Sequence, residues 1–461
     1  MAERSPDPSP PRPAARPLQS LAEVMAQMAP AASARRIRDT EVLPTAQALG
    51  RVLARALVSP LDVPPADNAA MDGYAVRSAD VAAATEAQPL CLPVSQRIAA
   101  GHPGQPLRPG TAARIFTGAF LPAGADAVVM QEDVQTVAAA AGTEGAADAA
   151  FGQVRLSRPV PAGQWVRRQA EDLRHGAEVL GVGRRLTPQA LGLAATAGAA
   201  ELCVVRRPRV ALLSTGDELV MPGQPLRPGA IYNCNRSTLQ ALALAAGCEV
   251  TDLGIVPDRL EATRAVLREA ARDHDLILSS GGVSFGEEDH IQPAVAAEGW
   301  LHHWQVAMKP GKPMVFGAVR RGAAEAEAEA AAAGPAAGPA DHGDPLSEAL
   351  FMGLPGNPVS SFVTFLMAVA PVLRLLQGAA AEGPAALGVR AGFDWPKPDR
   401  RREFLRGRIE ADGTVSLYPN QSSGVLTSAA WADVLVDLPA LQPVRRGDVV
   451  QVLPLAALIA C

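Results

Sequence analysis

The sequence predicts a multidomain protein of α/β and β parts, built around a central α/β domain whose mostly parallel sheet is covered by helices. Residues 206–378 carry this prediction, because apolar strand-like runs alternate there with helical runs, as in sheets that bury both faces. Short β-type runs between Gly/Pro turns fill residues 59–154 and 384–461, which predicts a β domain at each place. A chain of 461 residues also exceeds what one hydrophobic core supports.

The remaining parts follow from composition and periodicity. Residues 1–17 are rich in Pro, Arg and Ser, and we expect this N-terminal extension to be disordered. Residues 18–58 show helical periodicity, and mixed structure returns at 155–205, so the small β domain is expected to be inserted into a mixed, helical first domain. Low-complexity sequence at 322–348 predicts an exposed insertion within the α/β domain.

Composition limits the possible classes of function. Hydrophobic residues make up 48% of the chain and charged residues 19%, which fits a soluble globular protein. The net charge of −5 offers no basic excess to nucleic-acid phosphates, so no nucleic-acid partner is expected. Five scattered cysteines without CxxC spacing, and an N-terminus without an apolar secretory core, favour a cytoplasmic location. The apolar run Val359–Leu376 contains Pro371 and polar residues, so we expect a buried helix and no membrane partner.

Lysine is rare in this chain and clusters at one place. Among 42 basic residues, only Lys309, Lys312 and Lys397 are lysines, and the first two lie within MKPGKP. An ammonium is a compact point charge, whereas a guanidinium is a broad planar fork. The pair therefore indicates a need for compact charge, such as binding of an oxyanion, and chance clustering is the alternative.

The stretch SSGGVSFGEEDH, residues 279–290, combines features that suit opposite charges. Gly281 and Gly282 allow close approach of the backbone, and together with Ser284 they offer donors to an anion. The acids that follow would repel this anion unless a cation lay between them. The pattern indicates a phosphate-like ligand with a divalent metal, and a solvated acidic turn is the alternative.

Four loops of this kind are expected at the carboxyl ends of strands, where open α/β sheets bind ligands. Glu218 and Asp289 would supply oxygen ligands for Mg²⁺. Lys309 and Lys312 would supply charge for an oxyanion. The four loops are TGDEL at 215–219, SSGGVSFGEED at 279–289, KPGKP at 309–313 and LPGNPVSS at 354–361.

Two further stretches have functional and structural interpretations. In LPGNP, Pro355 and Pro358 stiffen a turn that opens a helix, whose N-terminus attracts anions, although a plain strand-to-helix turn explains the same residues. In PPADNAAMDGYAV, the pair Asp67-Asn68 is explained equally well by contact with a metal or ligand and by a purely structural turn. The Asp-Gly pair at 72–73 is an ordinary hairpin signal.

Taken together, these motifs resemble the molybdopterin molybdenumtransferases, the MoeA family to which the gephyrin E domain also belongs. The resemblance covers about residues 18–461. Its pieces occur in the family order, as DNAAMDGYAV, RIFTGAFLPAGADAVVMQE, GDELV with IYNCNR, SSGGVSFGEEDH, MKPGKP, LPGNPVSSF and SSGVLTSAAWADVLVDLP. It implies four domains, the last of them β-barrel-like, in a homodimer whose site lies between domain III of one chain and domain II of the other.

The reaction that the resemblance implies is insertion of molybdate into the dithiolene of adenylylated molybdopterin, with loss of AMP and use of Mg²⁺. A molybdopterin adenylyltransferase would be the substrate donor. By this resemblance, Asp67 and Thr117 look like the residues that domain II contributes to the site. The acids that look functional are Asp172, Glu218, Asp258 and Asp289. Contacts to molybdate or phosphate are implied for Lys309, Lys312, Ser360, Arg406 and Thr427. The loops add expected substrate contacts at Asn68, Ser280, Gly281, Gly282, Ser284, Pro355, Gly356, Asn357 and Pro358.

This chain departs from the family pattern at four positions: Ala66, Arg259, His290 and Thr427. They put in doubt the C-terminal molybdate site and the affinity for substrate. Three rival functions remain at this point. An adenylyltransferase shares only the α/β domain, a non-catalytic scaffold would not need intact acids and lysines, and a sugar-phosphate or nucleotide hydrolase could share the sheet topology.

Overall fold

A computed structural model describes residues 18–137, 151–283, 290–322 and 347–460. These residues belong to two compact units. The large unit comprises the described residues of Met1–Glu41, Gly50–Ala54 and Val204–Cys461, and the small unit those of Val42–Leu49 and Arg55–Cys203. The predicted insertion at 322–348, the N-terminal extension, Ser284 and Asp289 lie wholly or largely outside the described residues.

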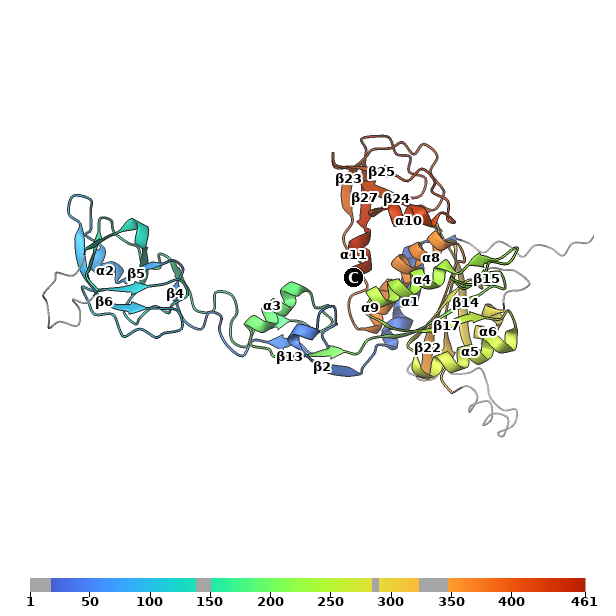
Figure 1. The fold of residues 1–461 in the computed structure, drawn as a ribbon, viewed down its shortest axis with the longest axis horizontal. Helices are drawn as coiled ribbons and strands as arrows, with labels where there is room; N and C mark the ends of the chain where they lie inside the picture. The colour runs from blue at the N-terminus through green and yellow to red at the C-terminus, as the bar shows by residue number, and fades with distance from the viewer. Residues whose placement is uncertain (1–17, 138–150, 284–289, 323–346, 461) are drawn as a thin grey trace, which may run out of the picture. The chain divides into compact units, whose positions relative to one another are not determined.

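The large unit is built on a seven-stranded sheet, and the prediction of a mostly parallel α/β sheet is confirmed (Figure 1). Four neighbouring strands are parallel to one another, whereas β21 runs antiparallel to both of its neighbours. In sheet order the strands are β1 (Leu18–Gln19), β19 (Gly299–Val306), β21 (Pro313–Arg320), β22 (Glu348–Leu354), β18 (Leu276–Ser280), β14 (Arg209–Thr215) and β17 (Glu249–Val256).

Helices cover both faces of this sheet because its central strands are apolar on both sides. In β14, Val210 and Leu212 pack into one hydrophobic core, while Ala211 and Leu213 pack into the other. The first core is covered by α1 (Leu21–Ala34), α4 (Cys234–Ala245), α8 (Pro358–Thr364) and α9 (Ala370–Leu376); the second is covered by α5 (Leu260–Asp273) and α6 (Ile291–Glu298) (Figure 1).

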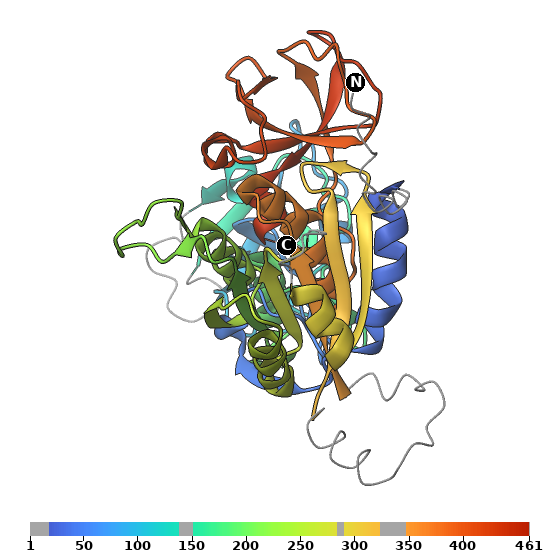
Figure 2. The same cartoon turned by 90° about the vertical axis from the view of Figure 1, so that its right-hand side faces the viewer.

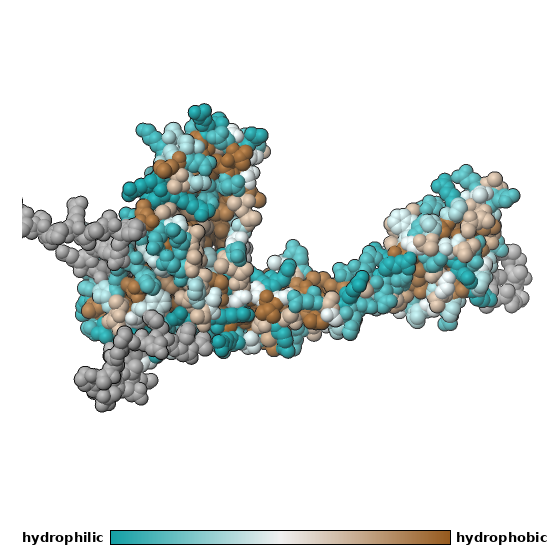
Figure 3. Space-filling view, turned by 180° about the vertical axis from the view of Figure 1, so that it is seen from behind, coloured by the Kyte–Doolittle hydropathy of each residue, from teal (hydrophilic) through white to brown (hydrophobic). Residues whose placement is uncertain are grey.

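The apolar run near residue 360 is a buried helix, as expected, but Pro371 does not break it. A π-helical turn (Phe365–Val369) joins α8 to α9, and the wider turn tolerates the missing proline N–H. By length and composition alone, Pro358–Leu376 could cross a membrane, yet 83% of its most apolar window is buried inside the protein. On the face shown in Figure 3, the hydrophobic residues of the large unit form scattered patches between hydrophilic ones.

A five-stranded barrel completes the large unit, which confirms the β-barrel-like C-terminal region (Figure 2). It closes because β26 pairs with both β24 and β27, and a short strand, β20, pairs with β24 from outside the closed ring. The elements are β20 (Met308–Lys309), β23 (Leu387–Ala391), β24 (Arg402–Ile409), β25 (Thr414–Leu417), α10 (Leu426–Trp431), β26 (Val434–Leu438), β27 (Val449–Pro454) and α11 (Leu455–Ala460). A separate pair, β15 (Leu219–Val220) and β16 (Ile231–Tyr232), follows β14.

The small unit contains a six-stranded sheet of β8 (Ala127–Met130), β5 (Gly73–Val76), β7 (Ala112–Ile115), β6 (Leu90–Ile98), β10 (Gln153–Leu156) and β9 (Gln135–Val137). Its other elements are β3 (Leu57–Val58), β4 (Asn68–Ala69), β11 (Val166–Arg167), β12 (Glu178–Leu180), α2 (Ser78–Val81), α3 (Pro188–Thr196) and the 3₁₀ turns η1 (Thr45–Gln47) and η2 (Gln131–Asp133). The strands β2 (Thr40–Pro44) and β13 (Glu201–Val205) form a separate two-stranded sheet.

The Asp-Gly hairpin signal at 72–73 is wrong. Gly73 is the first residue of strand β5, where a side-chain carbon would come within 1.8 Å of the Val129 carbonyl oxygen. Close approach of two strands, and not a turn, therefore explains this glycine.

Candidate active site

Two of the four predicted loops meet in one pocket of the large unit. This cavity of about 440 Å³ lies among the KPGKP loop, the LPGNP loop and the barrel. Its lining residues are Lys309, Pro310, Gly311, Lys312, Pro313, Pro355, Gly356, Asn357, Ser360, Arg401, Gln421, Ser422 and Ser423.

Local structure explains why these two loops are held in place. The LPGNP loop leaves β22 at Leu354 and enters α8 with Pro358 in its first turn. The KPGKP loop begins at β20, and β20 pairs in parallel with the barrel strand β24. Gly311 has φ of +109°, and a side-chain carbon there would lie 2.6 Å from Thr364 Oγ1, so only glycine fits against the helix.

A buried asparagine links the LPGNP loop to the glycine-rich loop. Asn235 Nδ2 donates to the carbonyl oxygen of Gly356 at 2.7 Å and lies 2.9 Å from Ser280 Oγ. Gly281 N donates to the carbonyl oxygen of Leu354 at 3.1 Å. Asn235 was not among the predicted site residues, although it lies within the IYNCNR motif.

The two lysines of MKPGKP have different surroundings. Lys309 Nζ lies 3.0 Å from Glu403 Oε1 and 3.4 Å from Asp399 Oδ2. Two barrel carboxylates therefore balance the charge of Lys309, and its contact with an oxyanion stays a prediction. Lys312 is half-buried and, within the described residues, forms no ion pair or side-chain hydrogen bond.

Arg401 brings a third cation to the pocket. Its guanidinium binds Asp399 through both carboxylate oxygens, at 3.0 and 2.9 Å. This contact, with Lys309 nearby, holds the pKa of Asp399 well below its usual range. The charged residues of this region are three cations, Lys309, Lys312 and Arg401, and two carboxylates, Asp399 and Glu403. Their formal excess is one positive charge (3 − 2 = 1).

Arg406 is fully buried in the barrel beside this pocket. It donates to Ser428 Oγ at 3.1 Å and to the carbonyl oxygens of Phe404 and Ser422 at 3.1 and 3.4 Å. Burial lowers the pKa of Arg406 to about 10. The other predicted residue of this region, Thr427, is exposed, and its hydroxyl lies 3.4 Å from Tyr418 OH; the hydroxyl that binds the Arg406 side chain is that of its neighbour Ser428.

A hollow of about 280 Å³ connects Arg406 with Lys309, Glu403 and Ser422. Arg406 therefore lines a cavity despite its burial, and its role as a substrate contact stays a prediction. Ser428 and Gln421, which bond the side chain and the backbone of Arg406, were missed, because no pattern in the sequence marks them.

The predicted acids Glu218 and Asp258 lie near each other beyond the carboxyl ends of β14 and β17. Burial raises the pKa of Asp258, and the neighbouring charges of Asp217 and Glu218 raise it further, whereas His290 lowers it. Among the described residues, no group of three or more His, Cys, Asp or Glu side chains is arranged to hold a metal ion. Since Asp289 lies outside those residues, the Mg²⁺ site stays a prediction.

The glycine pair that follows β18 has a packing explanation. Gly282 has φ of +69°, and a side-chain carbon there would lie 2.5 Å from Ile291 Cγ1 and 3.1 Å from Thr215 Oγ1. In this structure, Gly282 therefore packs closely against helix α6 and the end of strand β14. Contact of Gly281, Gly282 or Ser280 with a substrate stays a prediction.

The small unit holds the other predicted residues. Asp67 accepts from Gln169 N at 2.8 Å and from Arg168 Nη1 at 2.7 Å, and the first of these contacts lowers the pKa of Asp67 most. Thr117 donates from both N and Oγ1 to Asp72 at 2.8 Å. Thus Asp67 and Thr117 each have protein partners.

Asn68 and Asp172 differ in exposure. Asn68 is buried in β4, and its Oδ1 has no hydrogen-bond partner within the described residues, whereas Asp172 is exposed. Asn68 pairs with Phe120 in an isolated bridge, which places it near the loop that carries Thr117. Arg168 and Gln169, which fix Asp67, were not predicted from the sequence.

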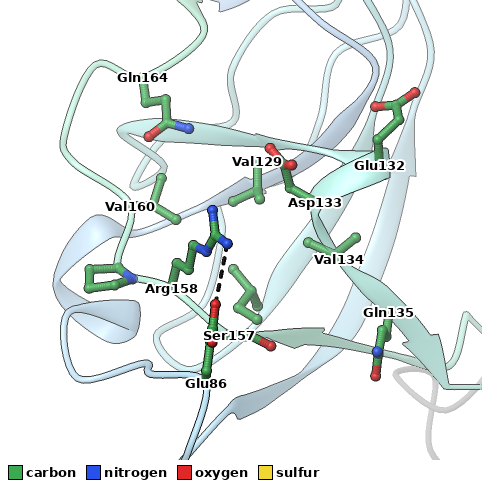
Figure 4. Close-up of a pocket in the computed structure, with 12 residues that line it drawn as sticks. Glu86, Val129, Glu132, Asp133, Val134, Gln135, Ser157, Arg158, Val160 and Gln164 are labelled. Atoms are coloured by element: carbon green, nitrogen blue, oxygen red, sulfur yellow. Dashed lines mark hydrogen bonds and ion pairs between the residues drawn. The ribbon is translucent and has the colours of Figure 1, made fainter.

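A larger hollow of about 610 Å³ in the small unit contains none of the predicted residues (Figure 4). Arg158 and Glu86 form an ion pair across it at 3.2 Å, with side chains 82% and 77% exposed. Exposed pairs of this kind contribute little. The smaller pocket at the lysine loop is therefore the better candidate site.

Known proteins share this architecture along the chain. Residues 18–198 match the MoeA N-terminal region (domain I and II), residues 211–375 the probable molybdopterin binding domain, and residues 388–455 the MoeA C-terminal region (domain IV). A MoeA structure from Pyrococcus horikoshii superposes with a TM-score of 0.73 at 27% identity, covering 95% of this chain and 99% of that chain.

Relatives with assigned names agree with these matches. The molybdopterin molybdenumtransferase of Haemophilus influenzae is 38% identical over 371 residues, or 80% of this chain and 81% of that protein. The molybdopterin molybdenumtransferase of Nostoc sp. is 36% identical over 410 residues, or 87% of this chain and 85% of that protein. The chain therefore belongs to the molybdopterin molybdenumtransferase family and is a transferase of molybdenum cofactor biosynthesis.

Proposed function

We propose that this protein inserts molybdate into the dithiolene of adenylylated molybdopterin, with Mg²⁺-dependent release of AMP, and that the lysine-loop pocket receives the oxyanion. The observation that carries the proposal is Lys312. This half-buried ammonium has no counter-ion among the described residues and lines a pocket of about 440 Å³. A tetrahedral dianion there would supply the missing negative charge.

Neighbouring residues would divide the work of binding. Lys312 would hold the oxyanion directly, and Ser360, which lines the same pocket, would donate from its hydroxyl. Lys309 would act mainly on protein structure, because its charge fixes Glu403 and Asp399 and so attaches the KPGKP loop to the barrel. Arg401 would add positive potential at the pocket wall.

The acids near the end of β14 fit a divalent cation. Glu218 and Asp289 would hold Mg²⁺, and the raised pKa of Asp258 reflects burial and repulsion from neighbouring carboxylates that a cation would relieve. Bound Mg²⁺ would neutralise phosphate charge and polarise the bond that releases AMP. The resemblance further supports a homodimer that receives its substrate from a molybdopterin adenylyltransferase, and the scattered cysteines support a cytoplasmic location.

Turnover of the intact protein tests this function. Purified protein is mixed with adenylylated molybdopterin, molybdate and Mg²⁺, and AMP and the molybdenum-loaded cofactor are quantified together. We expect equimolar products that require all three additions. AMP release that does not depend on molybdate would instead indicate a hydrolase, and unchanged substrate would indicate a scaffold.

The lysines provide a matched control for the same assay. Lys312→Ala should lose most activity at limiting molybdate, whereas Lys397→Ala, which removes the same charge at an exposed position, should not. Light scattering on the same preparations measures the oligomeric state. A monomer of full activity would rule out the expected homodimer.

A further inference from the structure

A second basic cavity lies at the opposite edge of the central sheet from the candidate active site. It has a volume of about 250 Å³ and lies near the amino ends of β14, β18 and β22. Seven residues of β14 separate the two edges, which corresponds to roughly 20 Å at about 3.3 Å per residue. Five arginines line the cavity: Arg35, Arg36, Arg38, Arg206 and Arg321.

The three carboxylates that also line this cavity are each paired with an arginine. Asp275 accepts from Arg206 Nη1 and Nη2 at 2.7 and 2.9 Å. Asp39 accepts from Arg206 Nε at 2.9 Å. Glu348 pairs with Arg35 and accepts from Trp300 Nε1 at 3.2 Å. With five arginines against three acids, the lining has a formal excess of two positive charges (5 − 3 = 2).

Arg321 is incompletely balanced. Its Nη1 and Nη2 donate to the carbonyl oxygens of Arg272 and His274, both at 2.8 Å. The distance from Nη2 to Asp275 Oδ1 is 4.0 Å. Its Nε is buried without a hydrogen-bond partner within the described residues. Burial lowers the pKa of Arg321, and the charges of Arg206 and Arg209 lower it further against partial compensation by Asp275 and Asp273. The Arg321 side chain is 29% exposed, and a partly buried cation in this state favours an additional anion nearby.

Arg35 supports the same conclusion independently. Its side chain is only 10% exposed, and its Nε is another buried donor without a partner in the described part of the chain. At the cavity mouth, Arg36 and Arg38 are exposed, and neither side chain forms an ion pair or hydrogen bond with a described residue. The inner wall and the mouth therefore both carry guanidinium groups that can receive an anion.

The size and chemistry of the cavity define the class of ligand. Guanidinium groups match the oxygens of phosphates in bidentate geometry. The cavity is smaller than the roughly 300–1,000 Å³ that drug-sized ligands occupy. We propose that this arginine cavity is a binding site for phosphate or pyrophosphate groups, separate from the site of molybdenum transfer.

The test uses the full chain carrying Lys312→Ala, so that anion binding at the candidate active site is weakened in every sample. Pyrophosphate and inorganic phosphate are titrated by isothermal calorimetry at fixed ionic strength. The pocket variant is Arg36→Gln/Arg38→Gln. Neither guanidinium bonds to another described residue, so the variant should fold.

Arg445→Gln/Arg446→Gln is the matched control, because it removes the same charge from exposed arginines of the barrel. We expect saturable pyrophosphate binding in the Lys312→Ala protein and in the control, weakened at least about tenfold in the pocket variant. Absence of saturable binding in the Lys312→Ala protein would overturn the proposal. Equal affinity in the pocket variant and the control would overturn it as well, since binding would then lie elsewhere.

Discussion

Removing the charge of Lys309 should destabilise the protein, whereas removing that of Lys312 should not. Glu403 is 1% exposed and has Lys309 Nζ at 3.0 Å as its cationic partner. In Lys309→Ala this buried carboxylate would keep only the hydrogen bonds from Trp395 Nε1 and Asp399 N, both at 2.9 Å. Lys312 has no carboxylate partner among the described residues.

The size of the effect follows from burial of the two partners. Loss of one partner of a fully buried pair costs about 3–5 kcal/mol. Lys309 is 41% exposed, so water reaches the site and screens the remaining charge. The two retained hydrogen bonds reduce the cost further. We therefore expect Lys309→Ala to lower the free energy of unfolding by about 1–3 kcal/mol.

A double-mutant cycle measures this interaction. The midpoint of urea unfolding is determined for Lys309→Ala, Glu403→Gln and the double variant, with Lys312→Ala as the matched control. We expect the double variant to be more stable than the sum of the single effects implies, because neither buried charge remains. Strict additivity, or an equal loss in Lys312→Ala, would refute the assignment of Lys309 to structure.

Three other predictions test the surroundings of the site. Ser428→Ala should cost about 1.5–3 kcal/mol in chemical denaturation, because it removes a hydrogen bond to buried Arg406, and exposed Thr427→Ala should change stability little; equal effects would contradict this assignment. Burial and nearby carboxylates raise the pKa of Asp258, so the contribution of Asp258 to stability should fall as pH rises from 3.8 through the raised pKa. Asp258→Asn should therefore weaken the dependence of the thermal midpoint on pH and raise the midpoint at neutral pH. An unchanged pH profile in Asp258→Asn would contradict this prediction. Replacing residues 323–346 with a short Gly/Ser turn should leave the thermal midpoint nearly unchanged, because Arg321 N donates to the Ser347 carbonyl oxygen at 2.7 Å and the flanking strands are paired neighbours; a large fall would show that the tract packs.

The central sheet could be predicted because its signal is local. Apolar strands such as RVALLST and DLILSS alternate with helical runs, and burial on both faces follows from that pattern. Continuity of the helix through Pro371 could not be predicted from the same pattern. It depends on the π-helical turn at Phe365–Val369, which no local pattern in the sequence marks.

The candidate site could be predicted only in part. Loops beyond the carboxyl ends of parallel strands share one edge, so the convergence of KPGKP and LPGNP was foreseeable. The difference between Lys309 and Lys312 was not. It depends on the pairing of β20 with β24, which brings Glu403 to Lys309 from a distant part of the chain. Likewise, packing of α10 on β24 decides that Ser428, and not its neighbour Thr427, reaches Arg406.

The affinity of the Lys312 variants for molybdate tests the central claim most directly. The apparent dissociation constant is measured from molybdate-dependent formation of the loaded cofactor in single-turnover experiments at fixed ionic strength, with Lys397→Ala as control. Loss of one charge-assisted hydrogen bond costs about 1.5–3 kcal/mol, so Lys312→Ala should weaken molybdate roughly ten- to a hundredfold. Lys312→Arg should restore only part of this, because a planar guanidinium does not fit a loop bounded by two prolines as an ammonium does. An unchanged dissociation constant in Lys312→Ala would contradict the assignment of the oxyanion to this pocket.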